Sequence, residues 1–574
     1  MCNSYEISAL PLSLRSNREK VERFLALSGL RLEAVDYYAV ACDDQDRIVA
    51  GGGLKDDVIK CIAVSDDARN TGLSNKLISH LIRMAAQSGT DSVKVFTKPG
   101  NRKIFESMGF VVIAQSPQAV LMENGVGGVK AYAQYLKQQA LAVPQGRRGA
   151  IVMNANPFTR GHRYLVEQAA ARVDHLFVIV VREDREMFSY AERLAMVRQG
   201  CADVPHVTVL EGSDYAVSQF TFPTYFLKDL NEATPTHITL DIDLFATHIA
   251  PALGVSMRLV GSEPEDELTA CYNAMMHDLL PARGVEMTEI PRLADAQGAP
   301  VSASQVRKAL QDGLLPQALA LTPAVTWPFL LTHLACQAME RELDLTPKPG
   351  LVDRHDNGAH RDMDYALMRR SIATLRPYFT QMVHSDDVDR LRALGQEAEH
   401  AMLAATGGVN THRGALFCMG LALAAWHPGA TAGELQAGIM RLAAQFPATQ
   451  GTHGSQAGAA HHVRGALQMA REGYPQLFSE WLPALNRHHD PMRVLLLIMS
   501  QLDDTNVIYR VGYEQAQRVK LLSRQLLEHY SLQGVEQLNA QFVASNISPG
   551  GAADMLALCL LIQSMGLAQP GDLK

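Results

Sequence analysis

The hydrophobic pattern of this 574-residue chain changes character near residue 325. Residues 149–325 alternate apolar, strand-like runs with amphipathic segments, which predicts a parallel β-sheet flanked by helices. From Phe329 onward strand alternation almost vanishes and long helical patterns dominate. Ligands of parallel α/β sheets bind at the carboxyl ends of the strands, so polar residues just after a strand are the first candidates for a site. The pattern therefore predicts an α/β region followed by an all-α region.

The two periodicities also predict individual elements and domain boundaries. Strands are expected at Leu176–Val181, Val207–Leu210, Ile238–Leu240 and Met257–Val260. Helices are expected at Phe329–Leu343, Tyr365–Phe379, Asp387–Ala405, Glu434–Ala444 and Arg493–Asp503. Glycine- and proline-rich stretches divide the chain into a small α/β domain at 1–125, a linker at 126–148, a second α/β domain at 149–326 and an all-α domain at 327–574.

The composition is typical of a globular protein in a reducing compartment. Apolar residues make up 47% of the sequence and the formal net charge is −8, which argues against a broad nucleic-acid-binding surface. The eight cysteines form no C-x-x-C pair, so neither a zinc site nor a disulfide framework is indicated. No apolar run is long enough to span a membrane, and no signal-peptide core follows the N-terminus. We therefore expect a cytoplasmic protein without membrane or nucleic-acid partners.

The stretch Met153–Leu165 joins a strand-like run to an amphipathic helix through a Thr-x-Gly-His turn. The unpaired N–H groups and the dipole of a helix start favour an anion. Within the turn, Gly161 allows the backbone to approach a phosphate closely, and His162 can donate to an oxygen that gains charge in a transition state. The turn predicts a polyphosphate cradle, with an ordinary surface turn as the alternative.

A second helix start, Val301–Arg307, offers two hydroxyls and an arginine, again suited to polyphosphate. Together the two motifs resemble the HxGH nucleotidyltransferase superfamily, which transfers a nucleoside monophosphate and releases pyrophosphate. The resemblance implies catalysis by His162 and Arg307. It implies nucleotide binding by Asn156, Thr159, Gly161, Ser302 and Ser304. Asn156 stands where many members have Asp, which preserves hydrogen bonding but removes the charge.

Residues 1–125 carry a second phosphate-binding pattern. A strand is expected at Val58–Val64, followed by an Arg-x-x-Gly-x-small loop containing Arg69 and Gly72, and by a helix at Asn75–Ala86. With Ile104–Phe110 farther on, this order resembles the acetyl-CoA-binding half of GNAT acetyltransferases. Two positions depart from that pattern. Ser74 stands where Gly or Ala is usual, and Phe105 stands where many members have a Tyr that protonates the departing thiol. We therefore expect this domain to bind a CoA-like arm rather than to transfer acetyl groups in the standard way.

The whole of residues 1–325, including Val260–Asn273, resembles citrate lyase ligase. The resemblance implies that ATP activates acetate to acetyl-AMP, which then acetylates the thiol of a CoA-like prosthetic group on the citrate lyase acyl carrier subunit. His162 and Arg307 would steady the departing pyrophosphate, and Mg²⁺ would bridge the phosphates. Asp241 and Asp243 follow an expected strand, where they either face the nucleotide or cap a helix.

Four polar, glycine-rich turns interrupt the helical region. They are Thr346–Met363, Thr406–Gly414, Asp503–Gly512 and Ser548–Asp554. Carboxylates beside lysine and arginine at loop–helix junctions predict a metal-assisted nucleotide site, although helix caps can explain any one of these turns.

These turns resemble triphosphoribosyl-dephospho-CoA synthase across nearly all of residues 329–570. In that family a ribose hydroxyl of 3′-dephospho-CoA attacks the ribose C1′ of ATP, and adenine leaves. The candidate bases are Asp353, Asp362 and Asp554. Asp503 and Asp504 are the expected Mg²⁺ ligands. Substrate-binding roles are assigned to Lys348, Arg413 and Arg510 as counter-charges, to His360 and His412 as donors or acid, and to Asn410 and Asn506.

The helical region also departs from the family pattern. Ala466 follows Arg464–Gly465 where a Glu is usual, and Val511 replaces a Gly in an Arg-Gly-Gly turn. Arg471 and Glu472 could substitute after a shift of helix register. These changes leave open whether the second activity is full, weak or lost. The cluster His453, His461 and His462 is interpreted as a polar loop rather than a metal site, since no known ligand spacing is present.

Three functions remain open at this stage. The first is a bifunctional maturation enzyme for citrate lyase. The second is a ligase with a binding-only C-terminal domain. The third is a general adenylyltransferase of cofactor biosynthesis, because fold alone does not fix function. Malonate decarboxylase maturation is an alternative pathway for the C-terminal half.

Overall fold

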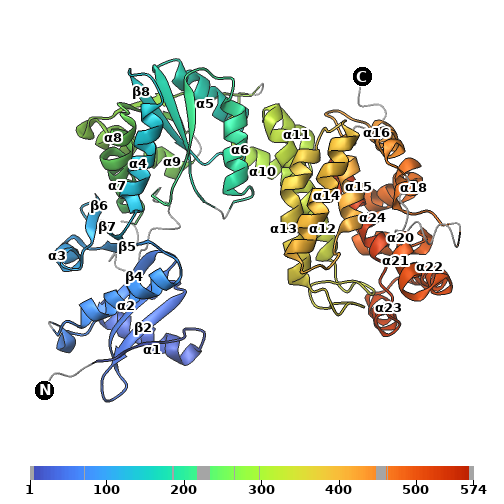
Figure 1. The fold of residues 1–574 in the computed structure, drawn as a ribbon, viewed down its shortest axis with the longest axis horizontal. Helices are drawn as coiled ribbons and strands as arrows, with labels where there is room; N and C mark the ends of the chain where they lie inside the picture. The colour runs from blue at the N-terminus through green and yellow to red at the C-terminus, as the bar shows by residue number, and fades with distance from the viewer. Residues whose placement is uncertain are drawn as a thin grey trace. The chain divides into compact units, whose positions relative to one another are not determined.

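A computed structural model describes residues 5–69, 71–183, 186–215, 233–263, 266–295, 298–447, 461 and 463–567. The chain forms two compact units (Figure 1). One contains Met1–Asn156 and Gly161–Val301, and the other contains Pro157–Arg160 and Ser302–Lys574. The division therefore falls inside the α/β segment predicted at 149–326. No helix in the described part of the chain is both long and apolar enough to cross a membrane.

The first unit begins with a seven-stranded sheet in the order β1-β2-β3-β4-β5-β7-β6. Its strands are β1 (Ile7–Ala9), β2 (Tyr37–Cys42), β3 (Ile48–Lys55), β4 (Val58–Val64), β5 (Ser92–Thr97), β6 (Val111–Gln115) and β7 (Val120–Gly125). The helices beside it are α1 (Arg15–Leu27), α2 (Leu73–Gln87) and α3 (Arg102–Glu106). Only the pair β4–β5 is parallel in this sheet. The predicted strand at Val58–Val64 and the helix predicted at Asn75–Ala86 are confirmed.

The second sheet of this unit is five-stranded and entirely parallel, in the order β10-β9-β8-β11-β12. Its strands are β8 (Arg148–Met153), β9 (His175–Val180), β10 (Val207–Glu211), β11 (Met257–Gly261) and β12 (Glu286–Ile290). The longer helices are α4 (Gly128–Leu141), α5 (Arg160–Ala170), α6 (Tyr190–Cys201), α7 (Ala233–Leu244) and α9 (Glu267–Leu279). Every residue of β9 is buried, as expected for a parallel strand covered on both faces.

One predicted strand is wrong. Ile238–Leu240 lies within helix α7, where Ile238, Leu240, Ile242 and Leu244 are all buried. Their spacing of two residues resembles a strand. The helix, however, packs against β6 and α9 and buries residues on most of its sides. An enclosed helix needs no 3.6-residue apolar stripe, so the periodicity is misleading here.

The regular elements described in the second unit are all helices, joined by loops. Its helices are α10 (Ala303–Gln311), α11 (Leu315–Ala320), α12 (Trp327–Leu343), α13 (Tyr365–Met382), α14 (Val388–Ala405), α15 (Arg413–Ala425), α16 (Ala432–Gln445), α18 (Ala466–Arg471), α19 (Leu482–His488), α20 (Pro491–Gln501), α21 (Thr505–Val511), α22 (Tyr513–Glu528), α23 (Leu532–Ala544) and α24 (Gly550–Ser564). The five predicted helices are present, although α20 ends two residues before the predicted Asp503. Helix α24 is apolar on nearly every side and packs against α12, α15 and α20 at the core.

Candidate active sites

The Thr-x-Gly-His turn follows β8 at the carboxyl edge of the parallel sheet, and His162 lies in the first turn of α5. Burial and the nearby positive charge of Arg292 lower the pKa of His162 to about 4. The imidazole is therefore neutral at pH 7, so it can act as a hydrogen-bond donor to a developing negative charge rather than as a cation. Arg292 supplies the fixed positive charge beside it.

Asn156 is buried in a polar network at the same edge of the sheet. Its amide nitrogen donates to the Glu186 carboxylate, and its amide oxygen accepts the Phe188 N–H at 3.2 Å. The other Glu186 carboxylate oxygen accepts from Asn154 at 2.8 Å. An Asp at position 156 would place its carboxylate against the Glu186 carboxylate, whereas the Asn156 amide donates a hydrogen bond to it. The departure from the family pattern therefore has a local electrostatic cause.

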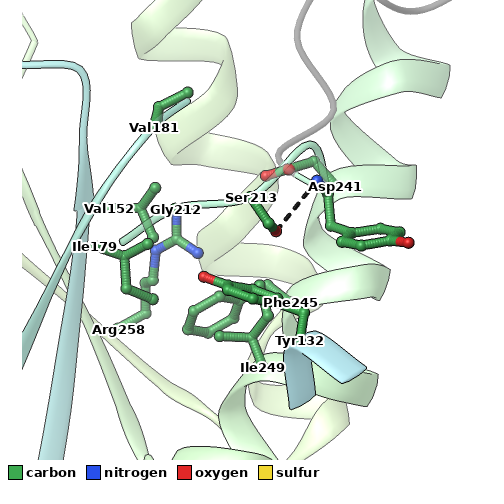
Figure 2. Close-up of a pocket in the computed structure, with 11 residues that line it drawn as sticks. Tyr132, Val152, Ile179, Val181, Gly212, Ser213, Asp241, Phe245, Ile249 and Arg258 are labelled. Atoms are coloured by element: carbon green, nitrogen blue, oxygen red, sulfur yellow. Dashed lines mark hydrogen bonds between the residues drawn. The ribbon is translucent and has the colours of Figure 1, made fainter. Parts of the chain in front are cut away.

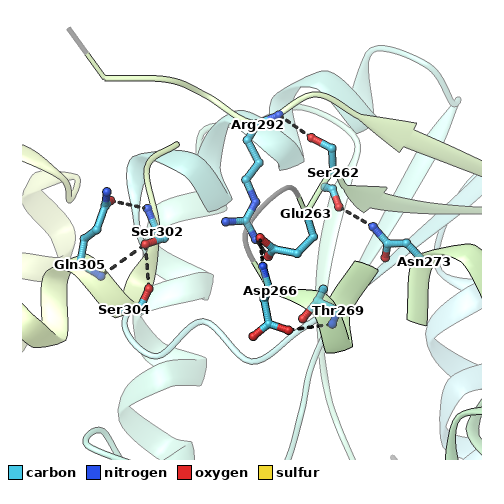
Figure 3. Close-up of polar contacts among 10 residues, drawn as sticks. Ser262, Glu263, Asp266, Thr269, Asn273, Arg292, Ser302, Ser304 and Gln305 are labelled. Atoms are coloured by element: carbon cyan, nitrogen blue, oxygen red, sulfur yellow. Dashed lines mark hydrogen bonds and ion pairs between the residues drawn. The ribbon is translucent and has the colours of Figure 1, made fainter. Parts of the chain in front are cut away.

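Arg292 and Glu263 follow two neighbouring strands, β12 and β11, at the same edge of the sheet (Figure 3). The Arg292 guanidinium contacts the Glu263 carboxylate, and the Arg292 N–H donates to the Ser262 hydroxyl at 3.1 Å. Asp266 caps α9 by accepting the Thr269 N–H at 2.8 Å. Sequence reasoning missed Arg292, although its place just after a strand was an available signal.

The second predicted phosphate motif forms the start of α10 in the other unit. Ser302 caps this helix in a reciprocal capping box with Gln305, and the hydroxyls of Ser302 and Ser304 lie 2.9 Å apart (Figure 3). Arg307 lies one turn farther along the helix and is half-buried. Thr159 is buried and belongs to this same unit. The joint action of these residues with His162 stays a prediction.

The GNAT-like loop has the expected open backbone. Gly72 precedes α2 with φ of 76°, and no atom lies within 4 Å of the position that a Cβ would occupy. Arg69 is exposed and forms an ion pair with Asp66 at 2.7 Å. Phe105 is buried and packs edge-on against Phe110, with ring centroids 5.5 Å apart. Position 105 is therefore part of the core, and it offers no acid to a departing thiol.

The helical unit contains a pocket of about 590 Å³, counting its open mouth. Six of the predicted substrate-binding or catalytic residues line it: Lys348, His360, Asn410, His412, Asn506 and Asp554. Helices α15 and α24 begin at this pocket, so the positive ends of two helix dipoles meet there. Such an arrangement favours a polyphosphate.

Close backbone contacts hold the two helix starts together. A Cβ on Gly414 would lie 1.8 Å from a carboxylate oxygen of Asp554, and a Cβ on Gly550 would lie 2.4 Å from the Asn506 amide nitrogen. Any side chain at either position would displace a residue that lines the pocket. Two of the glycines in the predicted polar turns are therefore required by packing.

Asp554 is fully enclosed and reaches the pocket from the first turns of α24. Burial, and then the charges of Asp504 and Glu342, raise its pKa well above the usual range, while the Ala415 N–H opposes this by donating to it. A carboxylate with a raised pKa is suited to accept a proton near neutral pH. Of the three predicted bases, it is the only one that lines the pocket.

A buried ion pair lies beside Asp554. The Lys348 ammonium contacts the Glu342 carboxylate at 2.7 Å and donates to the Glu342 carbonyl at 3.0 Å. The side chains are only 1% and 6% exposed. Glu342 was not predicted, although an acidic residue near the end of an apolar helix was a signal that could have been used.

His412 presents an imidazole nitrogen to the pocket. Its Nδ1 lies 2.8 Å from the Ser371 hydroxyl oxygen, which accepts from Thr411 at 2.7 Å. Its Nε2 is buried and has no hydrogen-bond partner among the described residues. Burial and the Lys348 charge lower the pKa of His412 to about 3, so the ring is neutral. Because the Ser371 hydroxyl hydrogen remains free to donate to Nδ1, the arrangement favours a hydrogen on Nε2.

His360 lies on the same pocket, with Nε2 2.7 Å from the Ser548 hydroxyl. Burial, and then the charge of Arg510, lower its pKa. Asp362 lies 3.7 Å from His360 Nδ1, but its side chain is 62% exposed and does not line the pocket.

Two predicted carboxylates instead hold loops in place. Asp353 accepts the backbone N–H groups of three residues, Lys348, His355 and Asp356, at 2.8–3.0 Å. Asp504 caps α21 and also accepts the Ala552 N–H at 3.0 Å, which ties α21 to α24. Neither side chain lines the pocket, so their geometry indicates structural use, and the base role of Asp353 stays a prediction.

The remaining charged residues predicted to bind substrate or metal interact with other protein groups instead. Asp503 pairs with Lys520 at 2.5 Å, and Arg413 pairs with Glu399 at 2.7 Å. Arg510 donates to the Ala359 carbonyl at 2.7 Å and to the Asn546 side chain at 2.6 Å, joining two loops. Over the described ranges, no group of three or more His, Cys, Asp or Glu side chains is arranged to hold a metal. The geometry therefore does not favour Asp503 and Asp504 as a Mg²⁺ pair.

The sequence departures have local explanations. Arg464 pairs with Glu472 at 3.1 Å, so a carboxylate reaches this arginine from the far end of α18. Val511 is helical, and Gly512 takes the positive φ of 92° that ends α21. His461 stacks on Tyr513, while His453 and His462 lie outside the described residues.

The fold and sites define a protein that joins a GNAT-like domain and a parallel α/β domain to a helical domain with a phosphate-binding pocket. The acetyltransferase (GNAT) domain family matches residues 16–127. The family described as citrate lyase ligase C-terminal domain matches residues 148–330. The family described as ATP:dephospho-CoA triphosphoribosyl transferase matches residues 328–571.

Curated relatives divide the chain in the same way. A [citrate [pro-3S]-lyase] ligase of Klebsiella pneumoniae is 41% identical over 55% of this chain and 93% of its own length. The protein of that name from Escherichia coli is 38% identical over 55% of this chain and 92% of its own length. A "Probable 2-(5''-triphosphoribosyl)-3'-dephosphocoenzyme-A synthase" of Pseudomonas fluorescens is 39% identical over 40% of this chain and 90% of its own length. The chain therefore belongs to the citrate lyase ligase family in its N-terminal part and to the triphosphoribosyl-dephospho-CoA synthase family in its C-terminal part.

Proposed function

We propose that this chain is a bifunctional enzyme of citrate lyase maturation. Its C-terminal unit makes 2′-(5″-triphosphoribosyl)-3′-dephospho-CoA from ATP and 3′-dephospho-CoA. Its N-terminal part activates acetate with ATP and acetylates the thiol of the finished prosthetic group on the citrate lyase acyl carrier subunit. Family membership in both parts supports this proposal, because the two activities belong to one pathway. We further propose that it acts in the cytoplasm.

In the ligase reaction, an acetate oxygen forms a bond to the α-phosphorus of ATP and pyrophosphate leaves. Neutral His162 donates a hydrogen bond to the oxygen that gains charge, and Arg292 adds a positive charge beside it. Ser302, Ser304 and Arg307 hold the departing pyrophosphate at the start of α10. The thiol of the CoA-like arm then attacks the acetyl carbonyl of acetyl-AMP, and AMP leaves. The loop at Arg69 and Gly72 holds that arm through its phosphates.

In the transferase reaction, a ribose hydroxyl of dephospho-CoA forms a bond to C1′ of the ATP ribose as the bond to adenine breaks. The observation that carries this proposal is one pocket that unites a carboxylate of raised pKa, Asp554, with an unpartnered ring nitrogen, Nε2 of His412. Asp554 accepts the hydroxyl proton, and His412 donates a hydrogen bond to the adenine nitrogen that gains charge. Lys348 and the starts of α15 and α24 hold the triphosphate.

Mg²⁺ fits this pocket better than it fits Asp503 and Asp504. Mg²⁺ typically binds through one or two carboxylates together with substrate phosphates. Burial, and then the charges of Asp504 and Glu342, raise the pKa of Asp554, so a cation at this pocket would offset part of the negative charge around it. An ion carried by the triphosphate would offset the charge of the phosphates, and Asp554 would remain free to accept the hydroxyl proton.

Two assays on the full chain test the proposal. With ATP, acetate and the prosthetic-group-bearing carrier subunit, the protein should release pyrophosphate and acetylate the carrier. With ATP, 3′-dephospho-CoA and Mg²⁺, it should release adenine and form one equivalent of the triphosphoribosyl product for each adenine released. Chromatography measures both products. Dephospho-CoA binding without adenine release would support a binding-only C-terminal unit instead. AMP transfer to phosphopantetheine would support a general adenylyltransferase.

A further inference from the structure

The first unit contains a second pocket, of about 340 Å³ counting its open mouth, on one face of the parallel sheet. Val152 of β8 and Ile179 of β9 form its floor, and Gly212 follows β10 at its rim (Figure 2). Phe245 and Ile249 close it from the helical layer. These strand ends lie at the carboxyl edge of the sheet, where the Thr-x-Gly-His turn also begins.

Among the described residues that line this pocket, Arg258 of β11 is the only arginine or lysine. Its side chain is buried, with 5% of the residue exposed, and its guanidinium lies over the Phe245 ring at 4.1 Å (Figure 2). Its Nε–H has no hydrogen-bond partner within the described part of the chain. Among the described residues, the neighbouring acids Asp243 and Glu263 pair with other arginines, Arg283 and Arg292, and none is recorded as an ion-pair partner of Arg258. A buried guanidinium edge without an anion is costly, so an anionic ligand would be stabilised there.

The acid nearest in the lining is already engaged. Asp241 accepts a hydrogen bond from the Tyr272 hydroxyl, and Tyr272 in turn interacts with Arg258. The Tyr272 hydroxyl therefore interacts with both the carboxylate and the guanidinium. The remaining lining is largely aliphatic and aromatic, which leaves room for a short alkyl group and little else.

We propose that this pocket binds the acetate substrate and that Arg258 holds its carboxylate. The inference rests on the proposed ligase function and deepens it, because it names the residue that selects a small monocarboxylate. The carboxylate faces the guanidinium edge, and the methyl group contacts Val152 and Ile179. One carboxylate oxygen is held by Arg258 while the other forms the bond to the α-phosphorus of ATP, so that pyrophosphate leaves with the electron pair.

Residues of the first sheet contact Tyr215, one of the residues that line this pocket. Tyr215, which lines the rim, donates to the Glu123 carboxylate of β7. Lys94 of β5 lies 4.6 Å from the Tyr215 ring centroid and forms an ion pair with Asp57 at 2.6 Å. The GNAT-like domain, which would hold the CoA-like arm, therefore also positions one wall of the acetate pocket.

Acetate-dependent exchange of pyrophosphate into ATP, measured with the full chain, tests this proposal. Arg258→Met should raise the KM for acetate about tenfold to a hundredfold, the loss expected for one charge-assisted hydrogen bond. The KM for ATP should change less than about twofold, and Arg258→Lys should recover part of the acetate affinity. Arg148→Lys is the matched control. Arg148 is also buried with an unpartnered Nε, but its other nitrogens donate to four backbone carbonyls and it lines no described pocket.

A second variant keeps the test sharp if Arg258→Met fails to fold. Val152→Leu adds a methylene to the pocket floor and should raise the KM for propionate more than the KM for acetate. The proposal is overturned if Arg258→Met leaves the acetate KM unchanged, or if it changes only the KM for the carrier thiol, in which case the pocket holds the thiol arm. It is also overturned if Val152→Leu changes neither the KM for acetate nor the KM for propionate. Absence of exchange in the unmodified protein would instead refute the proposed ligase function.

Discussion

Removing the Lys348 ammonium should destabilise the helical unit strongly. In the structure its Nζ lies 2.7 Å from the Glu342 carboxylate, and both side chains are almost wholly enclosed. Lys348→Met would leave Glu342 as a buried, uncompensated charge. Breaking a buried pair in this way costs about 3–5 kcal/mol, which is a large part of the stability of a typical domain. The double variant Lys348→Met/Glu342→Gln should recover most of that loss, because it leaves no charge behind.

The chain offers a clean optical probe for this measurement. Its three tryptophans, Trp327, Trp426 and Trp481, all lie in the helical unit. Urea unfolding followed by tryptophan fluorescence therefore reports that unit alone. The matched control is Lys308→Met, which breaks an exposed pair with Asp312 at 2.8 Å in the same unit and should cost about 0.5 kcal/mol or less.

Two results would refute this reasoning. Equal losses for Lys348→Met and Lys308→Met would mean that burial of the Lys348–Glu342 pair has no energetic consequence. The loss of stability in the Lys348→Met/Glu342→Gln variant could also equal the sum of the losses in the two single variants. That result would mean that the two side chains do not interact, since residues in direct contact should couple by about 0.5–3 kcal/mol.

The two proposed sites should respond separately to substitution and to pH. His162→Ala should lower acetate-dependent pyrophosphate release about a hundredfold or more and leave adenine release intact, which the two product assays measure in parallel. Asp554→Asn should abolish adenine release and leave pyrophosphate release intact. Loss of both activities in either folded variant would contradict a two-site enzyme. The folded pKa of His412, about 3, lies below the ordinary value of 6.5, so the unfolded chain binds the proton more readily. The stabilisation by neutral His412 is therefore complete above pH 6.5 and is lost as pH falls, by up to about 1.4 kcal/mol per pH unit. His412→Gln should flatten the tryptophan-monitored stability between about pH 6 and 4, and an unchanged slope would argue against a buried neutral ring.

The sequence predicted long, regular elements better than enclosed ones. The helix at Phe329–Leu343 has a sustained apolar pattern, and the structure confirms it. The strand predicted at Ile238–Leu240 was wrong, because a helix surrounded by protein carries apolar residues at spacings that also suit a strand. Local pattern cannot distinguish these two cases, since the difference lies in what surrounds the segment.

Site residues were predictable where a motif placed them at a helix start, and less so where chemistry depends on distant neighbours. His412 and Asp554 both came from polar turns, and both line the pocket. Asp353 came from a similar turn but binds backbone N–H groups, because a carboxylate at a loop–helix junction has the same sequence signature whether it caps or catalyses. Glu342 and Arg258 lie within regular elements and belong to no motif, so only the tertiary structure identifies them.

The charge balance of the helical pocket argues for a function rather than for stability alone. Asp554, Asp504 and Glu342 bring three carboxylates together in a buried region, and Lys348 is the one lysine or arginine among the described residues that line the pocket. Glu342 is paired with Lys348 and Asp504 accepts backbone N–H groups, so Asp554 is the carboxylate that a purely structural core would avoid, since buried charges that are not paired are destabilising. The starts of α15 and α24 place two positive dipole ends at the same pocket, and these favour an anion. A triphosphate accompanied by a divalent cation meets both requirements at once, and neither the phosphate nor the cation would do so without the other.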